Sequence, residues 1–99
     1  MQSRTPTKQE KLWMSKVAEL GCIVCHEFYQ VYSPAEVHHL DGKTKPLAHL
    51  KTIGLCYRHH REGVNNDMYV SRHPFLNEFE KRYGTQESLL EKTHELLEL

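Results

Sequence analysis

Two short cysteine and histidine pairs constrain this chain of 99 residues more than any other feature. Cys22 and Cys25 form the first pair, and Cys56 and His59 form the second, each with two residues between its members. Side chains at this spacing can bind one zinc ion from a tight turn, and two such pairs complete a four-ligand set. We therefore expect a structural zinc ion that joins two distant segments of the chain.

The fourth ligand of this zinc site stays open at the level of sequence. His59 and His60 are adjacent, so either could complete the set, and His26 directly follows the first pair. Residues 22–26 also match the pattern for covalent haem attachment, with Met68 as a conceivable axial ligand. We favour zinc, because haem attachment requires an exported protein and no signal peptide is recognisable.

The length and composition of the chain favour a single domain, residues 1–99, with a metal staple. A domain of this size buries only about 60 to 65% of the surface that its unfolded chain exposes. Three cysteines cannot form an all-disulfide framework, and metal-bound thiolates fit a reducing cytoplasm. Apolar runs are far shorter than the ~20 residues that span a bilayer, so we expect no membrane role.

The charge of the chain is zero overall but unevenly distributed. Residues 1–61 contain 9 Lys/Arg and 5 Asp/Glu, whereas residues 62–99 contain 4 and 8. The segment from Gly42 to Arg61 has no acidic residue. A solvated loop explains such a segment by charge alone, but beside metal ligands it is well placed to bind nucleic-acid phosphates. The candidate phosphate-binding residues are Lys43, Lys45, Lys51, Arg58 and Arg61.

Helical periodicity predicts a first helix from about Lys8 to Leu20. Thr7 and Glu10 have the spacing of a capping box, and Trp13 and Val17 are expected to face inward. Residues 22–25 should then form a tight knuckle in which backbone amides donate to sulfur.

The middle of the chain predicts a hairpin followed by a helix. Residues 28–37 are β-prone, and short strands are expected at residues 36–40 and 52–55. Asp41-Gly42 should turn the chain, and the polar residues 43–50 should form a loop. A helix beginning near Tyr57 would carry His59 and His60.

Two further helices are predicted in the last third of the chain. Pro74 should open the first and Gly84 should close it, and Thr85 should cap the second. The residues expected to face inward are Phe75, Phe79, Tyr83, Leu89, Leu90, Thr93, Leu96 and Leu97. His94, which lies among glutamates, is expected to be solvated.

Histidines remain after a zinc site is completed, which suggests a second, catalytic metal centre. His38 and His39 are adjacent on a predicted strand, so their side chains should point to opposite faces. One could bind an ion through a neutral ring while the other accepts a proton from a water as a general base.

Three segments together resemble the HNH, or ββα-metal, nuclease motif in its zinc-supported form. They are Cys22-x-x-Cys25, Glu36-Val37-His38-His39-Leu40 and Leu55-Cys56-x-x-His59-His60. From the Lys8 helix to residues 82–86, the whole chain is similar to small phage and prophage proteins of the YbcO and Ref type. The resemblance implies an α+β fold: a zinc-stabilised, treble-clef-like hairpin and helix with one N-terminal and two C-terminal helices.

This resemblance also implies an activity and roles for particular residues. Ref proteins are RecA-dependent recombination-enhancement nucleases, so the implied activity is DNA endonuclease and the implied partners are DNA and a RecA-type recombinase. His39 matches the general base, and His38 and His60 match ligands of a catalytic ion, with Mg²⁺ or Mn²⁺ favoured over Zn²⁺. His73, just before Pro74, could reach the ion or a phosphate. Cleavage would leave 5′-phosphate ends.

The chain departs from the motif at three places, one of which is His73, which lies outside the core motif. The middle Asn of the motif has no clear counterpart, and His49 and Thr52 occupy that region instead. We expect His49 to position the loop by a hydrogen bond. The second pair is Cys-His where many members have Cys-Cys. The alternative interpretation is a non-catalytic zinc-dependent module that binds nucleic acid or a recombinase; strandedness of the DNA and the oligomeric state stay open.

Overall fold

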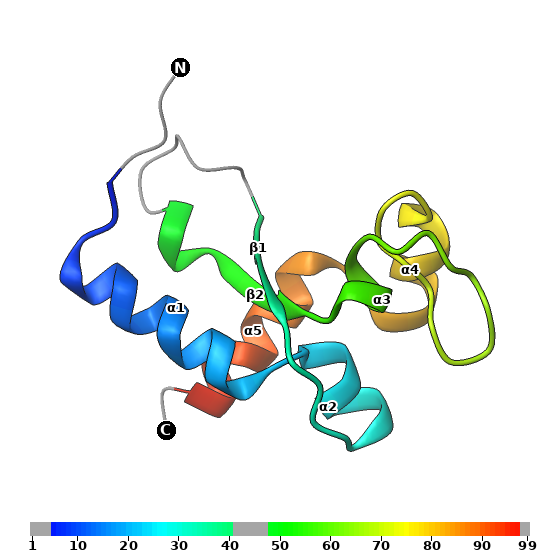
Figure 1. Cartoon of the computed structure of the whole chain (residues 1–99), viewed down its shortest axis with the longest axis horizontal. Helices are drawn as coiled ribbons and strands as arrows, with labels where there is room; N and C mark the ends of the chain where they lie inside the picture. Colours follow the sequence, from blue (N-terminus) through cyan, green and yellow to red (C-terminus); the bar gives the residue numbers. More distant parts are fainter. Residues whose placement is uncertain (1–4, 41–47, 98–99) are drawn as a thin grey trace.

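The computed structural model describes residues 5–40 and 48–97, which form an α+β fold around a two-stranded hairpin (Figure 1). The elements in chain order are α1 (Lys8–Leu20), α2 (Ile23–Tyr29), β1 (Glu36–His39), the 3₁₀ turn η1 (Ala48–Leu50), β2 (Thr52–Leu55), α3 (Tyr57–His60), α4 (Leu76–Tyr83) and α5 (Gln86–Leu97). The predicted class, with an N-terminal helix, a hairpin, a following helix and two C-terminal helices, is confirmed. None of the helices in the described ranges is long and apolar enough to cross a membrane.

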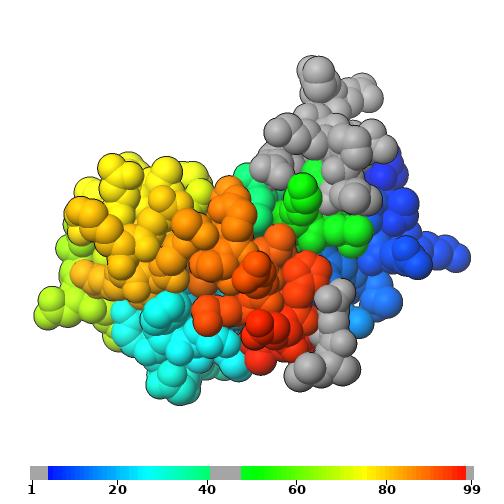
Figure 2. Space-filling model, turned by 180° about the vertical axis from the view of Figure 1, so that it is seen from behind, coloured from blue at the N-terminus to red at the C-terminus, as the bar shows by residue number. Residues whose placement is uncertain are grey.

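The hairpin pairs β1 with β2 in antiparallel register, with Glu36 opposite Leu55 and His39 opposite Thr52. All four residues of β2 are buried, whereas those of β1 are only partly buried. α1, α2 and α5 all pack against β2. Seen from behind, α5 crosses the middle of the molecule between α4 and α1, with α2 along its lower side (Figure 2). β2 is therefore the central element, and β1 is the more accessible strand of the hairpin.

Two glycines allow β2 to lie directly against the corner between α1 and α2. A Cβ atom at Gly54 would collide with the carbonyl oxygen of Gly21. Gly21 ends α1 with a positive φ of 83°, a conformation that favours glycine. Because Cys22 follows this corner and Cys56 follows β2, the close backbone approach brings the two cysteine pairs together.

The predicted first helix is confirmed, including its cap. The backbone N–H of Glu10 donates to Thr7 Oγ1 at 3.2 Å, and the backbone N–H of Thr7 donates to Glu10 Oε1 at 2.8 Å. Trp13 is buried and its Nε1–H donates to Thr52 Oγ1 at 3.1 Å. His94 stacks on the Trp13 ring with centroids 4.5 Å apart, so the expected solvated position of His94 is wrong.

The β-prone assignment of residues 28–37 is wrong over most of its length. Phe28 and Tyr29 belong to α2, which ends at Tyr29 and is capped by Gln30 in the left-handed region, and residues 30–35 form no regular element. Both aromatic side chains contact Tyr83: the Phe28 ring packs edge-on at 5.2 Å, and the Tyr29 and Tyr83 hydroxyls lie 2.8 Å apart. Tertiary packing thus overrides a weak strand propensity.

The remaining elements agree with prediction except at their boundaries. α4 begins at Leu76, two residues after Pro74, and α3 is only one turn long. The predicted loop contains η1 at its end, while the Asp41-Gly42 turn lies outside the described residues. Thr85 caps α5 by accepting from the Ser88 N–H at 3.2 Å. The inward residues are buried (Phe79, Tyr83, Leu89, Thr93) or partly buried (Phe75, Leu90, Leu96, Leu97).

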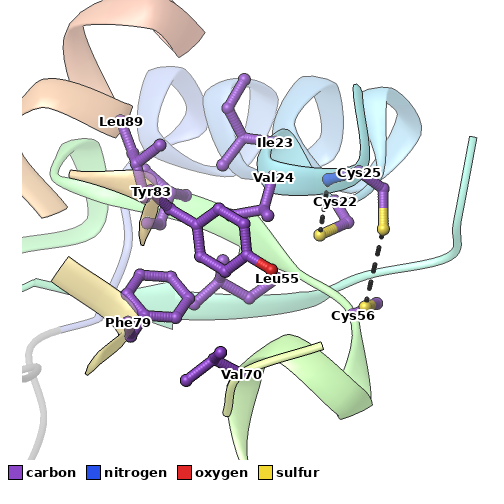
Figure 3. Packing of buried hydrophobic residues seen from close by; sticks show 11 residues of the cluster. Cys22, Ile23, Val24, Cys25, Leu55, Cys56, Val70, Phe79, Tyr83 and Leu89 are labelled. Carbon is purple, nitrogen blue, oxygen red and sulfur yellow. Dashed lines mark hydrogen bonds between the residues drawn. The ribbon is translucent and has the colours of Figure 1, made fainter. Parts of the chain in front are cut away.

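The buried apolar side chains form a cluster contributed by both halves of the chain (Figure 3). Phe79 and Tyr83 from α4 and Leu89 from α5 lie on one side of Leu55 from β2, and the three cysteines lie at the opposite edge. The cysteines are therefore held by the core itself, which fixes the spacing of their sulfur atoms.

Candidate functional site

The two cysteine and histidine pairs converge on one point at the edge of the core. The ligand atoms of Cys22, Cys25, Cys56 and His59 all lie within 4.8 Å of one another, and all four residues are buried. Nδ1 of His59 lies 3.7, 3.5 and 3.2 Å from the sulfurs of Cys22, Cys25 and Cys56, respectively. Tetrahedral zinc bonds imply ligand separations of about 3.5 to 3.8 Å. A Cys₃His set with these separations fits a structural zinc ion.

The fourth member of this group is His59 and not His60. Nε2 of His59 lies 3.2 Å from the Met68 carbonyl oxygen and 3.3 Å from the Tyr83 hydroxyl. Donation from Nε2–H to that carbonyl leaves the lone pair on Nδ1, which faces the sulfurs. His26 lies outside the group, on the surface beside Glu27 at 3.6 Å. This arrangement fits the zinc interpretation and not the haem pattern.

Hydrogen bonds and burial change the pKa values of the cysteine thiols in this group. The Cys25 backbone N–H donates to Cys22 Sγ at 3.4 Å, as predicted for the knuckle. Hydrogen bonds from Cys22, and then from Cys56, lower the pKa of Cys25, whereas hydrogen bonding and burial raise the pKa of Cys22. Cysteine binds metal in the thiolate form, and the Cys25 thiol is the one whose pKa these contacts lower.

Three further histidines converge beside the first group. Ligand atoms of His38, His60 and His73 lie within 4.8 Å of one another. His38 comes from β1, His60 from α3, and His73 from the segment before α4, whose backbone N–H donates to the His60 carbonyl at 2.9 Å. His38 and His60 are partly buried and His73 is exposed, so the group opens to solvent. Three nitrogen atoms at this spacing could hold a metal ion and leave one side open to solvent.

A carboxylate and an arginine hold the ring of His60. Nδ1 of His60 lies 2.7 Å from Glu36 Oε1, and Arg61 donates to the same carboxylate through Nε at 2.9 Å and Nη2 at 2.7 Å. The Arg61 hydrogen bonds, followed by that of His60, lower the pKa of Glu36 to about 2. An ionised carboxylate at Nδ1 leaves Nε2 of His60 as the nitrogen for a metal.

His38 is held by α5 and kept neutral. Its Nε2 lies 3.2 Å from Gln86 Oε1, and Gln86 Nε2 donates to the Leu40 carbonyl at 3.3 Å. Burial, followed by the neighbouring His60 and Arg72 charges, lowers the pKa of His38 to about 4, although the hydrogen bond that His38 donates to Gln86 Oε1 opposes this shift. A neutral ring at physiological pH keeps the lone pair that a metal requires.

His39 follows His38 on β1, and its side chain contacts His49. Nε2 of His39 is 3.0 Å from His49 Nδ1, and the rings are nearly perpendicular at 81°. His49 is buried in η1, and its carbonyl accepts from Thr52 Oγ1 at 3.2 Å. His49 thus fixes the orientation of the His39 ring through its own side chain. The predicted role of His49 was to position the loop by a hydrogen bond.

Arg72 was missed by the sequence analysis. The side chain of Arg72 is 10% exposed, and Nε and Nη1 make no hydrogen bond; a Glu80 carboxylate oxygen lies 3.9 Å from Nη1. Burial lowers the pKa of Arg72, and its charge acts on His38 and His73. A buried guanidinium with unsatisfied donors beside three histidines attracts an anion. Its position directly before His73 was the one sequence signal available.

The predicted phosphate-binding residues have different environments. Lys43 and Lys45 lie outside the described residues, and Lys51 is exposed. Arg58 lies 5.0 Å above the Tyr69 ring and 3.5 Å from Glu62. Arg61 pairs with Glu36, the carboxylate that contacts His60, so its charge is partly neutralised and less available to a phosphate.

The hairpin and helix thus carry a buried Cys₃His group that fits a structural zinc ion and a more open three-histidine group that could hold a second ion. The family model described as recombination enhancement, RecA-dependent nuclease matches residues 6–98. The chain therefore belongs to the family of RecA-dependent recombination-enhancement nucleases. The Ref-like resemblance predicted from the sequence is confirmed by this match.

Proposed function

We propose that this protein is a metal-dependent DNA endonuclease of the HNH type that acts in recombination, with a RecA-type recombinase as partner. Membership in the RecA-dependent nuclease family supports a nuclease role in recombination. The observation that carries the metal-dependent mechanism is the convergence of His38, His60 and His73, with His39 on the same strand as His38.

The three histidines would hold one divalent ion on the open side of the hairpin. When bound, the ion supplies Lewis-acid stabilisation of the charge that develops on the scissile phosphate and on the leaving oxygen. We keep Mn²⁺ and Mg²⁺ as the proposed ions, and the donor set favours Mn²⁺ of the two, since imidazole nitrogen is a poor ligand for Mg²⁺.

His39 acts as the general base that accepts a proton from the attacking water. The His49 contact at 3.0 Å holds its ring in one orientation. A positioned general base contributes about 10² to 10⁴-fold in rate. Arg72 supports this chemistry by placing a positive charge beside His38 and His73, where a phosphodiester would lie.

The direct test is DNA cleavage by the full-length, zinc-loaded protein. Supercoiled plasmid and single-stranded DNA are incubated with Mg²⁺, Mn²⁺ or Zn²⁺, each with and without a RecA-type recombinase filament. We expect cleavage by the wild type and a loss of about 10² to 10⁴-fold in His39→Ala. His26→Ala is the matched control, because His26 lies on the surface outside both groups. The proposal is wrong if the wild type cuts no substrate with the recombinase supplied, or if His39→Ala cuts as fast as the wild type.

Metal content separates this proposal from a non-catalytic zinc-dependent binding module. The nuclease proposal expects a second ion per chain after incubation with Mn²⁺, and expects His38→Ala to lose that ion while retaining zinc. If the protein is a binding module, it should hold zinc alone, and its DNA affinity should not depend on His38 or His39. Elemental analysis of the desalted proteins measures the difference.

A further inference from the structure

A solvent-open cavity of about 380 Å³ lies at the start of α3. It is lined by Ser33, Pro34, Cys56, Tyr57, Arg58 and Tyr69. We propose that this cavity binds an unstacked nucleobase and so directs the nuclease to single-stranded or locally unpaired DNA. The inference rests on the proposed function and specifies the substrate of the same site.

Tyr57 and Arg58 offer flat surfaces for a base, and Tyr69 supports Arg58 from below. Tyr57 is 51% exposed. Tyr69 is backed by the ring of His59, with centroids 4.8 Å apart, so the zinc group fixes its position. The guanidinium of Arg58 lies 5.0 Å above the Tyr69 ring. Aromatic and guanidinium planes stack on any base, because every base has a π-face.

The charge at the cavity fits a nucleotide better than an apolar peptide. Arg58 has a 60% exposed side chain, so it can contact the phosphate that accompanies a stacked base. The volume lies near the lower end of the range of about 300 to 1,000 Å³ for small-ligand sites. Such a cavity accommodates a base that has left its helix, whereas a paired base within a duplex cannot enter it.

The cavity is connected to the three-histidine group through α3. Tyr57 and His60 are three residues apart on this helical turn, so their side chains are neighbours. Arg61 lies 5.2 Å above the Tyr57 ring and binds Glu36, which holds His60. A base stacked on Tyr57 would therefore bring the adjoining phosphate towards His60.

The test measures DNA binding without cleavage, in the full-length zinc-loaded His39→Ala protein. Fluorescence anisotropy compares a labelled oligothymidine, an abasic strand of the same length and a duplex. We expect Tyr57→Ala to weaken binding of oligothymidine by about 5- to 100-fold and Tyr57→Phe to retain it. The abasic strand should bind weakly and independently of Tyr57. Tyr32→Ala is the matched control, because Tyr32 is 66% exposed but does not line the cavity.

Three outcomes would overturn the inference. In the first, Tyr57→Ala and its parent bind oligothymidine with equal affinity. In the second, the parent binds the abasic strand as tightly as oligothymidine. In the third, Tyr57→Ala loses binding to the recombinase filament but binds oligothymidine as its parent does. The last outcome would assign the cavity to protein docking. Zinc content of each variant verifies folding. Because binding is measured without cleavage, failure of the nuclease proposal would leave this readout intact.

Discussion

The side chain of Arg72 shows a conflict between stability and function at the scale of one residue. A buried guanidinium with two unbonded nitrogens destabilises the folded state, since the lost water contacts are not replaced. The Glu80 carboxylate at 3.9 Å compensates only part of this charge. The charge of Arg72 acts on His38 and His73, so a functional role can outweigh this loss of stability.

Replacing Arg72 by a flexible apolar residue should therefore separate the two effects. We expect Arg72→Met to raise the free energy of unfolding by about 1 to 3 kcal/mol and to weaken DNA cleavage. Arg72→Lys keeps the charge and should retain more activity than Arg72→Met. Denaturant unfolding and cleavage assays on the same preparations measure both quantities. A less stable Arg72→Met protein with wild-type cleavage would contradict the argument.

The lowered pKa of His38 predicts a pH dependence of stability. Burial lowers this pKa from 6.5 to about 4, so between these values the unfolded chain binds a proton that the folded chain excludes. The stabilisation is complete above pH 6.5 and is lost as the pH falls towards 4. From about pH 7.5 to 5.5, the wild type should lose about 1 kcal/mol more than His38→Gln, which cannot titrate there.

Chemical denaturation of both zinc-loaded proteins at several pH values measures this difference. Parallel pH profiles for wild type and His38→Gln would show that His38 is protonated equally in the folded and unfolded chains.

At the scale of elements, the site depends on how closely β2 approaches the corner between α1 and α2. Gly54→Ala places a methyl group against the Gly21 carbonyl oxygen, a backbone atom that cannot move without shifting the Cys22 segment. We expect at least about 2 kcal/mol of destabilisation and weaker zinc retention. Gly63→Ala is the matched control: its Cβ meets nothing within 4 Å, so only its φ of 87° costs about 1 kcal/mol. Thermal melts and competition with a zinc chelator measure the two effects, and equal losses would argue against the close approach.

The elements that the sequence predicted well are those with local signals. α1 has a capping box, and Thr85 caps α5, so their starts depend only on neighbouring residues. α2 was missed because its Phe28 and Tyr29 side chains are held by Tyr83, more than fifty residues away in the chain. Strand propensity is a weak preference that such contacts override.

The same distinction applies to the site. Cysteine and histidine spacing predicted the first group, because ligand chemistry restricts the residue types, whereas His38 and His60 of the second group followed from the family resemblance. The choice of His59 over His60 depends on the contact of His59 Nε2 with the Met68 carbonyl. The role of Arg72 depends on the lack of hydrogen-bond partners for its Nε and Nη1 atoms in the folded chain. Both depend on three-dimensional surroundings that no local pattern encodes.

For the molecule as a whole, the structural zinc ion should decide whether the chain folds. Zinc binding at such a site contributes about 10 to 16 kcal/mol, compared with a total stability of about 5 to 15 kcal/mol for a domain. We expect a strong chelator to unfold the protein, as measured by circular dichroism and zinc content. Withholding Mn²⁺ should leave the spectrum unchanged. A melting curve that is unaltered after all zinc is removed would contradict this prediction.

The single turn of α3 has a consequence for how this protein can be altered. Successive helical residues point about 100° apart, and His59 and His60 use this angle to face two different groups. Inserting one residue between Cys56 and His59 would rotate both histidines away from their groups together. A shift in the register of α3 therefore alters the Cys₃His group and the three-histidine group together. Neither group can be adjusted in this way without disturbing the other.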